Sequence, residues 1–230
     1  MKISGLQKLT LLDFPGKTAA TIFTGGCNMR CPFCHNALLV TELSDADDFS
    51  EEEVLSYLKK RKGILDGVCI TGGEPLLQKD IASFIGKIKE LGLSVKLDTN
   101  GSYPDKLKSL VEAGLIDYIA MDIKNSKEKY SETVGIKDFD IASVSESISY
   151  IMSCGIDYEF RTTIVRELHE IQDIEKIGEW IKGAKRYFLQ NFVDSGNLIG
   201  DNLSAHSRET LDSMRISAEK YVDFVSLRGV

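Results

Sequence analysis

The chain alternates short apolar runs with longer segments in which apolar residues recur every three or four positions. Apolar runs of this length, bounded by glycine and polar residues, are typical of buried strands. Six such runs predict strands at Ala19–Thr24, Gly67–Thr71, Val95–Thr99, Tyr118–Ile123, Tyr158–Val165 and Tyr187–Phe192. A further run, Val222–Leu227, is a candidate for a last strand.

The segments between these runs carry the period of amphipathic helices. They predict helices over Ser50–Lys62, Asp80–Leu91, Leu107–Ala113, Val144–Cys154, Ile171–Ile181 and Ser207–Tyr221. The first has a clear start, because Ser50 fits an N-cap and Glu53 completes a capping box. Residues 193–205 are polar and contain glycine, which predicts a loop.

Six successive strand–helix units, with no linker, repeat or low-complexity tract, predict a parallel sheet covered by helices. The 230 residues fit one domain, residues 1–230. Polar or glycine-rich residues follow nearly every strand, where α/β sheets and barrels bind their ligands. We therefore expect one site built from Gly25–Cys27, Gly72–Glu74, Asp98–Asn100, Asp122–Lys124 and Gln190–Asn191.

Net charge, the N-terminal segment and the length of the apolar stretches limit the partners and the cellular compartment that we expect. A net charge of -7, from 28 basic and 35 acidic residues, gives no electrostatic reason to expect sequence-independent binding of nucleic acid. The N-terminal segment lacks the apolar core and cleavage site of a signal peptide. No apolar stretch approaches the roughly 18 residues that span a bilayer. We expect a cytoplasmic protein with no membrane partner.

Three of the five cysteines, Cys27, Cys31 and Cys34, lie in the segment GGCNMRCPFCHN, separated by three and then two residues. Structural disulfides are rare in the cytoplasm, so this grouping points to metal chemistry. Thiolates are the usual ligands of iron–sulfur clusters. Three of them supply three iron sites of a cubane and leave the fourth iron open to a non-protein ligand.

Structural zinc is the competing interpretation, and it needs four protein ligands in a closed tetrahedron. Cys69 lies in an apolar strand and Cys154 near a helix end, where both resemble ordinary buried thiols. His35 directly follows Cys34, which is awkward for a shared tetrahedron. The spacing alone leaves a cluster, zinc and redox thiols open.

The surrounding residues resemble the radical S-adenosylmethionine (SAM) superfamily. Its motif has the same cysteine spacing with an aromatic residue before the third cysteine, here Phe33, and a Gly-Gly-Glu-Pro segment after the next strand, here Gly72–Pro75. Within it, GLQKLTLLDFPGK, FTGGCNMRCPFCHN and YFLQNF resemble the longer type of anaerobic ribonucleoside-triphosphate reductase activating protein. LDTNG and MDIK are similar to pyruvate formate-lyase activating enzyme, but the histidine which that family has after the sixth strand is absent.

The resemblance implies a partial, open (β/α)6 barrel of TIM type and a 4Fe–4S cluster held by Cys27, Cys31 and Cys34. The amino and carboxylate groups of SAM would chelate the open iron, and one electron would break the sulfonium bond to give a 5′-deoxyadenosyl radical. This radical would take hydrogen from a backbone glycine of a partner, the anaerobic ribonucleotide reductase. A flavodoxin or ferredoxin would supply the low-potential electron.

The same resemblance implies which residues contact SAM. Gly72, Gly73 and Glu74 would bind the methionine ammonium, against the alternative of a plain strand-ending turn. Phe33 and His35 would contact the adenine, mainly through backbone atoms. Asp98 and Lys124 would contact the ribose hydroxyls and the methionine carboxylate. Asp122, on the same strand face as Lys124, and Gln190 are the remaining implied contacts. For the charged residues the alternative is a buried salt bridge that supports the barrel.

Other polar residues are weaker candidates. Arg161 would contact the ligand or pair with an acid, and Asn100 fits a turn. His169 and His206 are expected to be solvated. Trp180 is expected to pack within its helix, and the acidic run Asp45–Asp48 to form an exposed loop.

Three other functions stay open. The first is a radical SAM enzyme that acts on a small molecule, similar to 7-carboxy-7-deazaguanine synthase. The second is an activator of another glycyl-radical enzyme such as pyruvate formate-lyase. The third is a zinc-binding adaptor, which would leave the Gly72–Pro75 segment without a role.

Overall fold

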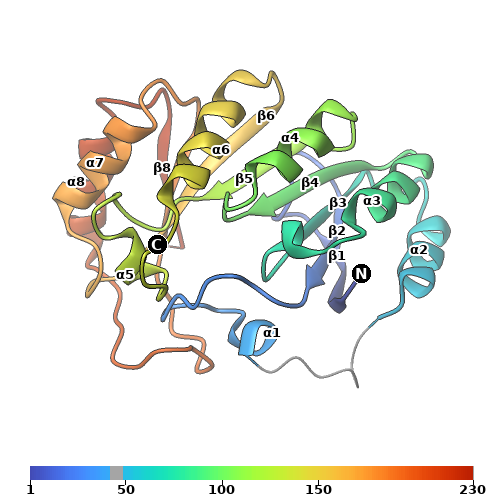
Figure 1. Cartoon of the computed structure of the whole chain (residues 1–230), viewed down its shortest axis with the longest axis horizontal. Helices are drawn as coiled ribbons and strands as arrows, with labels where there is room; N and C mark the ends of the chain where they lie inside the picture. Colours follow the sequence, from blue (N-terminus) through green and yellow to red (C-terminus); the bar gives the residue numbers. More distant parts are fainter. Residues whose placement is uncertain (42–48, 230) are drawn as a thin grey trace.

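The computed structural model describes residues 1–41 and 49–229, in which eight strands form one sheet in the order β1 to β8 (Figure 1). The strands are β1 (Ile3–Thr10), β2 (Ala19–Thr24), β3 (Gly67–Gly72), β4 (Ser94–Thr99), β5 (Tyr118–Asp122), β6 (Asp157–Ile164), β7 (Tyr187–Asn191) and β8 (Val225–Arg228). The six predicted strands and the candidate last strand are all present; Ala19–Thr24 has the predicted ends, and the ends of the others shift by at most three residues.

The sheet is parallel from β2 to β8, and its first strand runs antiparallel to the second. In the described residues β1 and β8 are the two edges, so the barrel is open, as expected. Strand β1 was not predicted, because most of its residues are half-exposed or exposed and its apolar positions do not alternate cleanly. Its pairing with β2 is a tertiary contact that local pattern does not encode.

Helices line the outer side of the curved sheet (Figure 1). The longer ones are α2 (Glu51–Lys60), α3 (Ile81–Glu90), α4 (Pro104–Glu112), α6 (Ile141–Ser153), α7 (Ile171–Trp180) and α8 (Arg208–Ala218). The capping box of Ser50 and Glu53 is confirmed. Sequence pattern missed three short elements, α1 (Ala37–Thr41), the 3₁₀ helix η1 (Pro75–Leu77) and α5 (Tyr130–Thr133), which are too short to show a period.

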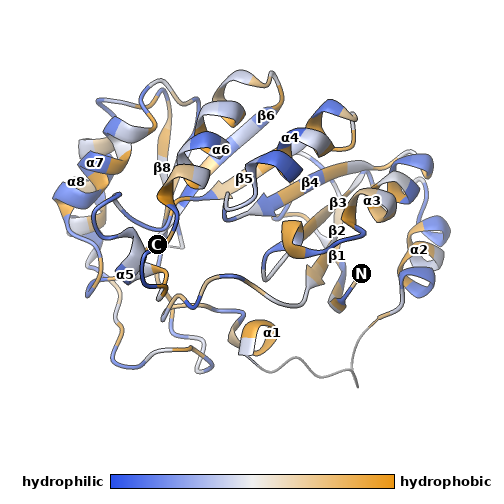
Figure 2. Cartoon of the chain, viewed as in Figure 1, coloured by the Kyte–Doolittle hydropathy of each residue, from blue (hydrophilic) through white to orange (hydrophobic). Residues whose placement is uncertain are grey.

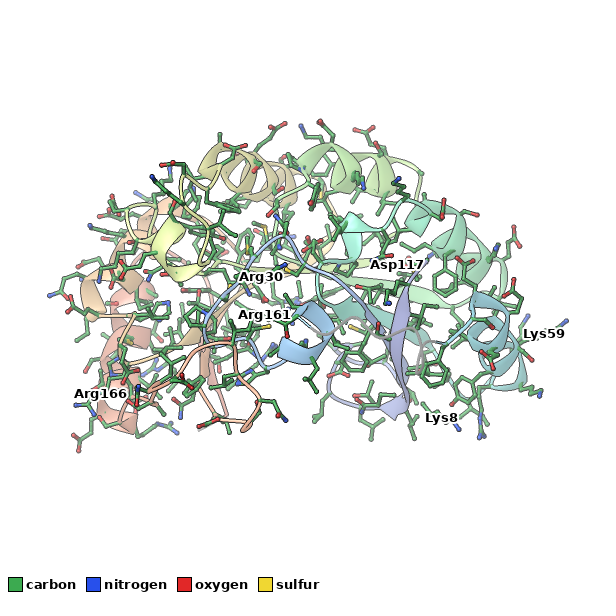
Figure 3. The ribbon with its side chains drawn as sticks, turned by 60° about the horizontal axis from the view of Figure 1, so that its bottom comes forward. Lys8, Arg30, Lys59, Asp117, Arg161 and Arg166 are labelled. Atoms are coloured by element: carbon green, nitrogen blue, oxygen red, sulfur yellow. The ribbon has the colours of Figure 1, made fainter. Side chains whose placement is uncertain are left out.

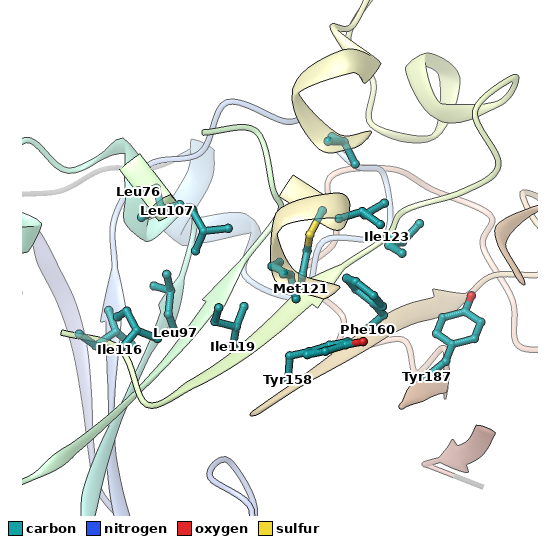
Figure 4. Packing of buried hydrophobic residues seen from close by; sticks show 14 of the residues in the cluster. Leu76, Leu97, Leu107, Ile116, Ile119, Met121, Ile123, Tyr158, Phe160 and Tyr187 are labelled. Carbon is teal, nitrogen blue, oxygen red and sulfur yellow. The ribbon is translucent and has the colours of Figure 1, made fainter. Parts of the chain in front are cut away.

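The core lies between the sheet and the outer helices. Alternate residues of each strand point to this layer, so Leu97, Ile119 and Met121 pack with Leu107 and their neighbours (Figure 4). Figure 2 shows hydrophobic residues along the central strands and hydrophilic residues on much of α2, α4 and α8. Among the described residues, no helix is long and apolar enough to cross a membrane.

Candidate active site

A cavity of about 270 Å³ lies at the carboxyl ends of the strands, on the inner side of the sheet. It brings together the three clustered cysteines and side chains from five parallel strands and the segments that follow them. The lining residues are Cys27, Met29, Cys31, Phe33, Cys34, His35, Asn36, Val40, Thr71, Gly72, Gly73, Asp98, Thr99, Asn100, Asp122, Lys124, Arg161, Thr163 and Gln190.

The cysteine-bearing loop is held by backbone contacts to other parts of the chain. Arg30 N donates to Val134 O at 2.8 Å, and Glu74 N donates to Gly26 O at 2.8 Å. On another side, Gly200 N donates to Pro32 O at 2.8 Å. Segments far apart in sequence therefore fix the path of the loop.

The three cysteines line one cavity and are free thiols. Burial raises the pKa of the Cys27 thiol, and it raises the pKa of Cys31 to about 12, while the nearby Lys124 charge acts in the opposite direction. Metal ligation requires thiolates, so loading such a site releases protons.

The spacing of ligands in space separates a cluster from a single ion. Within residues 1–41 and 49–229, no three His, Cys, Asp or Glu side chains lie close enough to hold one metal ion. A cubane makes a different demand, because each of its thiolate ligands binds a different iron atom. Three cysteines on one loop, around one cavity, fit that demand.

Gly72, the last residue of β3, and Gly73 lie too close to the end of β2 and to the cysteine loop for either to carry a side chain. A Cβ on Gly73 would lie 1.9 Å from Gly26 O, and Gly72 has a positive φ of 113° with Thr24 N 2.4 Å from its ideal Cβ. Asn36 Nδ2 donates to Gly72 O at 3.0 Å. The pair therefore presents bare backbone at the cavity wall.

Glu74 differs from the sequence-based expectation that its carboxylate faces a ligand. It is completely buried and does not line the cavity. Its Oε1 accepts hydrogen bonds from Leu76 N and Thr99 Oγ1, and its Oε2 accepts one from Asn100 N at 2.7 Å. The carboxylate ties the end of β3 to the end of β4, because three donors of the protein itself satisfy it.

Charged side chains of alternating sign cross the inner face of the sheet. Arg161 Nε donates to Asp122 Oδ1 at 2.8 Å, and Arg161 Nη1 donates to Asp98 Oδ2 at 3.1 Å. Lys124 Nζ extends the series to Asp122 Oδ2 at 2.9 Å, and Lys96 Nζ pairs with Asp98 Oδ1. Arg161 lies within the curve of the sheet in Figure 3, whereas Lys59 lies at the outer edge of the molecule.

This network keeps its members charged. Burial alone would raise the pKa of Asp122, but the charges of Arg161 and Lys124 outweigh it and hold the pKa well below its usual range. Burial alone would lower the pKa of Lys124, and Asp122 reverses that effect. The cavity wall thus carries fixed carboxylates beside a fixed ammonium.

The structure places the other expected ligand contacts at the cavity. Phe33, His35 and Gln190 all line it. The His35 ring stacks on Phe192 with centroids 5.9 Å apart, and its Nε2 lies 2.6 Å from Val193 O. Every expected contact therefore lies at the cavity except Glu74.

Asn100 does more than form a turn. Its Oδ1 accepts from Ser102 N at 3.0 Å, as in an Asx turn, and its Nδ2 donates to Asn28 Oδ1 at 2.9 Å. The same Nδ2 lies 3.8 Å from Cys27 Sγ. It therefore connects the end of β4 to the cysteine loop.

The expectation for His169 was wrong. The side chain is completely buried, its Nδ1 accepts from Val165 N at 3.1 Å, and its Nε2 lies 2.8 Å from Lys124 O. His206 is partly buried, with Nε2 2.8 Å from His169 O. Polar neighbours in sequence gave no sign of this packing.

The remaining expectations had mixed outcomes. Trp180 packs against the core, with an edge contact to Tyr130, as expected. Cys69 is fully buried, whereas Cys154 is only half-buried. The acidic run at 45–48 lies outside the described residues.

Several cavity residues received no role from the sequence, among them Asn36, Thr71 and Thr163. Alternation along strands gives a signal for some of them. Thr163 lies two residues after Arg161 on β6, so both point to the same face. Asn36 had no comparable signal, because it lies in an irregular loop.

Known proteins resemble this chain in sequence and in fold. Residues 21–182 match the family model of the Radical SAM superfamily. A Methanocaldococcus jannaschii protein that carries the name of a glycyl-radical enzyme activating enzyme is 33% identical over 234 residues, covering 99% of this chain and 96% of that protein. The pyruvate formate-lyase-activating enzyme of Clostridium pasteurianum is 27% identical over 197 residues, covering 80% of this chain and 77% of that protein.

Among solved structures, Streptococcus suis SuiB bound to S-adenosylmethionine matches with a TM-score of 0.69 and 15% identity, over 89% of this chain and 48% of that chain. The chain spans about half of that neighbour, and the likeness concerns the fold alone. The family model covers most of the chain, and the M. jannaschii relative covers nearly all of it. The chain therefore belongs to the radical SAM superfamily, uses a 4Fe–4S cluster and S-adenosylmethionine, and is an enzyme of the glycyl-radical enzyme activating family.

Proposed function

We propose that Cys27, Cys31 and Cys34 hold the cluster, that the adjoining cavity binds SAM, and that the protein generates a glycyl radical on an anaerobic ribonucleotide reductase. One observation carries the site assignment. The three cysteines line the same cavity as the bare backbone of Gly72 and Gly73. When bound and reduced, the cluster supplies the single electron that cleaves the sulfonium bond of SAM.

The chain's own residues bind and orient the methionine part of the cofactor. Its ammonium fits the backbone of Gly72 and Gly73, which line the cavity. The absence of side chains lets this turn pack against Thr24 and Gly26. Its carboxylate fits the ammonium of Lys124, whose own side chain is 17% exposed and held by Asp122. These contacts fix the sulfonium relative to the cysteine loop.

The nucleoside part fits the other side of the cavity. Phe33 and His35 provide two aromatic side chains beside Cys34, and Asp98 provides an acceptor for ribose hydroxyls. Arg161 holds Asp98 from behind at 3.1 Å, so the acceptor is oriented before a ligand arrives. Glu74 has a different role in this proposal, since it holds the glycine turn against Thr99 and Asn100 without contacting the ligand.

The reductase is favoured as partner by two sequence segments. GLQKLTLLDFPGK forms β1 and the turn after it, and YFLQNF forms β7 and its end; both resemble reductase activating proteins. Residues 193–206 after β7 contain no helix or strand that would enclose a small substrate. A low-potential donor, such as flavodoxin or ferredoxin, would reduce the cluster in the cytoplasm.

Electron paramagnetic resonance tests the proposal directly. Anaerobically reconstituted protein, reductant, SAM and the reductase are expected to give the doublet of a glycyl radical, together with 5′-deoxyadenosine. A reductase whose acceptor glycine is replaced by alanine is the matched control and should give no doublet. Cleavage of SAM without a doublet would refute the reductase as partner, and stimulation of cleavage by a small molecule would instead support a small-molecule enzyme.

A further inference from the structure

Lys96 is a completely enclosed charged residue directly below the active-site cavity. Its side chain is 2% exposed and does not line the cavity. Its ammonium pairs with Asp98 Oδ1 and lies 3.7 Å from Cys69 Sγ, the residue in register with it on β3. Two positions along β4, Asp98 points to the same face and reaches the cavity.

Burying an ammonium is costly unless it is paired, and an apolar side chain of similar size would fill this position without that cost. The neighbouring interior residue Cys69 is neutral, because burial raises the pKa of its thiol above the usual range. The packing around Lys96 therefore does not by itself require a charge at this position. The charge is required by its ionic partner, the Asp98 carboxylate.

The two oxygens of Asp98 have different partners. Oδ1 pairs with Lys96 and Oδ2 accepts from Arg161 at 3.1 Å. The same Arg161 also binds Asp122, so without Lys96 the only cation left to Asp98 in this series would be one that it shares with a second carboxylate. With Lys96, the series of side chains Lys96, Asp98, Arg161, Asp122 and Lys124 alternates in sign along its whole length.

We propose that Lys96 is a positioning residue for SAM and acts through Asp98. The Lys96 ammonium holds Asp98 Oδ1 on the side away from the cavity. This contact prevents the Asp98 carboxylate from rotating toward Arg161, so the carboxylate keeps its orientation at the cavity. This inference rests on the proposed function, in which Asp98 contacts the nucleoside. Lys96 itself touches no ligand.

A double-mutant cycle on the cluster-loaded protein tests the inference. Equilibrium dialysis with radiolabelled SAM gives the Kd of the wild type, Lys96→Met, Asp98→Asn and the double variant. Lys96→Met is expected to weaken binding about tenfold, a coupling within the range found for contacting residues. In the Asp98→Asn background the same change should alter the Kd by less than about twofold, because the residue through which Lys96 acts is gone.

Lys108→Met is the matched control, since it removes a lysine–carboxylate pair with Glu146 on the outer surface. It should leave the Kd and the iron content unchanged. If Lys96→Met does not fold, Lys96→Gln takes its place in the cycle, because it keeps a hydrogen-bond donor beside Asp98 Oδ1 and removes only the charge. The inference would be overturned if Lys96→Met weakened SAM binding by the same factor in the wild type and in the Asp98→Asn background. It would also be overturned if the Lys96→Met protein bound SAM with the wild-type Kd. A wild type that neither binds nor cleaves SAM would instead contradict the proposed function.

Discussion

Asp122 and Arg161 face each other in register on the neighbouring parallel strands β5 and β6, with Arg161 Nε 2.8 Å from Asp122 Oδ1. The same guanidinium donates to Asp98 on β4 at 3.1 Å. One arginine thus fixes carboxylates from two other strands at the edge of the cavity.

Replacing Arg161 by methionine should leave Asp98 and Asp122 without their shared partner. Breaking a buried ion pair by removing one member costs about 3–5 kcal/mol, and the cost here should lie at the lower end, about 3 kcal/mol, because Lys96 and Lys124 still pair with the two carboxylates. We expect a loss of unfolding free energy of that order in urea titrations, together with SAM binding weakened by at least about tenfold.

Arg208→Met provides the comparison for this change. Arg208 pairs with Asp212 one turn along α8, with a side chain that is 60% exposed. Exposed pairs of this kind contribute roughly 0.5 kcal/mol or less. An Arg161→Met protein no less stable than Arg208→Met would contradict a structural role for the charge network.

A methyl group at Gly73 should disturb the cysteine loop. Its Cβ would lie 1.9 Å from Gly26 O, directly before Cys27, so the backbone must move. We expect Gly73→Ala to lower the iron bound per chain after anaerobic reconstitution to below about half, with lost capacity to cleave SAM. Iron and sulfide assays measure the first effect.

Gly86→Ala is the matched control for the added methyl group. Gly86 lies inside α3, and an added Cβ would have no atom within 4 Å. The change should raise the unfolding free energy by about 0.5–1 kcal/mol, since glycine is a poor helix former. Cluster content should stay at the wild-type level, and equal iron in both variants would refute the steric argument.

The three clustered cysteines should be individually necessary. Serine at position 27, 31 or 34 removes one of three thiolate ligands. An iron–sulfur protein is brown, so we expect each single change to abolish this colour and the cleavage of SAM. Cys154→Ser, at the end of α6, should retain both. Zinc in place of iron in the wild type, after preparation without oxygen, would contradict the assignment.

The sequence predicted the fold well where local pattern dictates structure. Apolar runs and helical periods gave the six strand–helix units, since burial between sheet and helices imposes both patterns. Strand β1 was not predicted from the sequence, because its pairing with β2 is a tertiary contact along a half-exposed edge. The short helices α1 and α5 were not predicted, because four or five residues are too few to show the helical period of apolar positions.

The sequence predicted those site residues that follow parallel strands, because the carboxyl ends of these strands lie at one edge of the sheet. Asp98, Asp122 and Lys124 reach one cavity because parallel strands place their carboxyl ends at the same edge. The inward direction of Glu74 was not predictable, since a carboxylate after two glycines reads equally well as ligand contact or as turn support. Its three hydrogen bonds come from residues that only the folded chain brings together.

Glu74 should make the stability of the protein depend on pH. Burial raises the pKa of this carboxyl from 4.5 to about 7, against the hydrogen bonds from Asn100, Leu76 and Thr99. Between these values the folded protein holds a proton that the unfolded protein has released, so stability is highest at low pH within this range and falls as the pH rises through 7. The contribution is on the order of 3 kcal/mol at most.

Urea unfolding of the cluster-loaded protein at pH 5.5 and pH 8 would measure this effect. Glu74→Gln is neutral at both values, so its loss of stability between them should be smaller than that of the wild type. The other titrating groups are common to both proteins, so the difference between the two slopes reports Glu74 together with its charge interaction with Cys27. Glu52→Gln, an exposed change on α2, should keep the wild-type slope. If Glu74→Gln and the wild type lose the same stability, the buried carboxyl is ionised throughout, and its three hydrogen bonds outweigh the cost of burial.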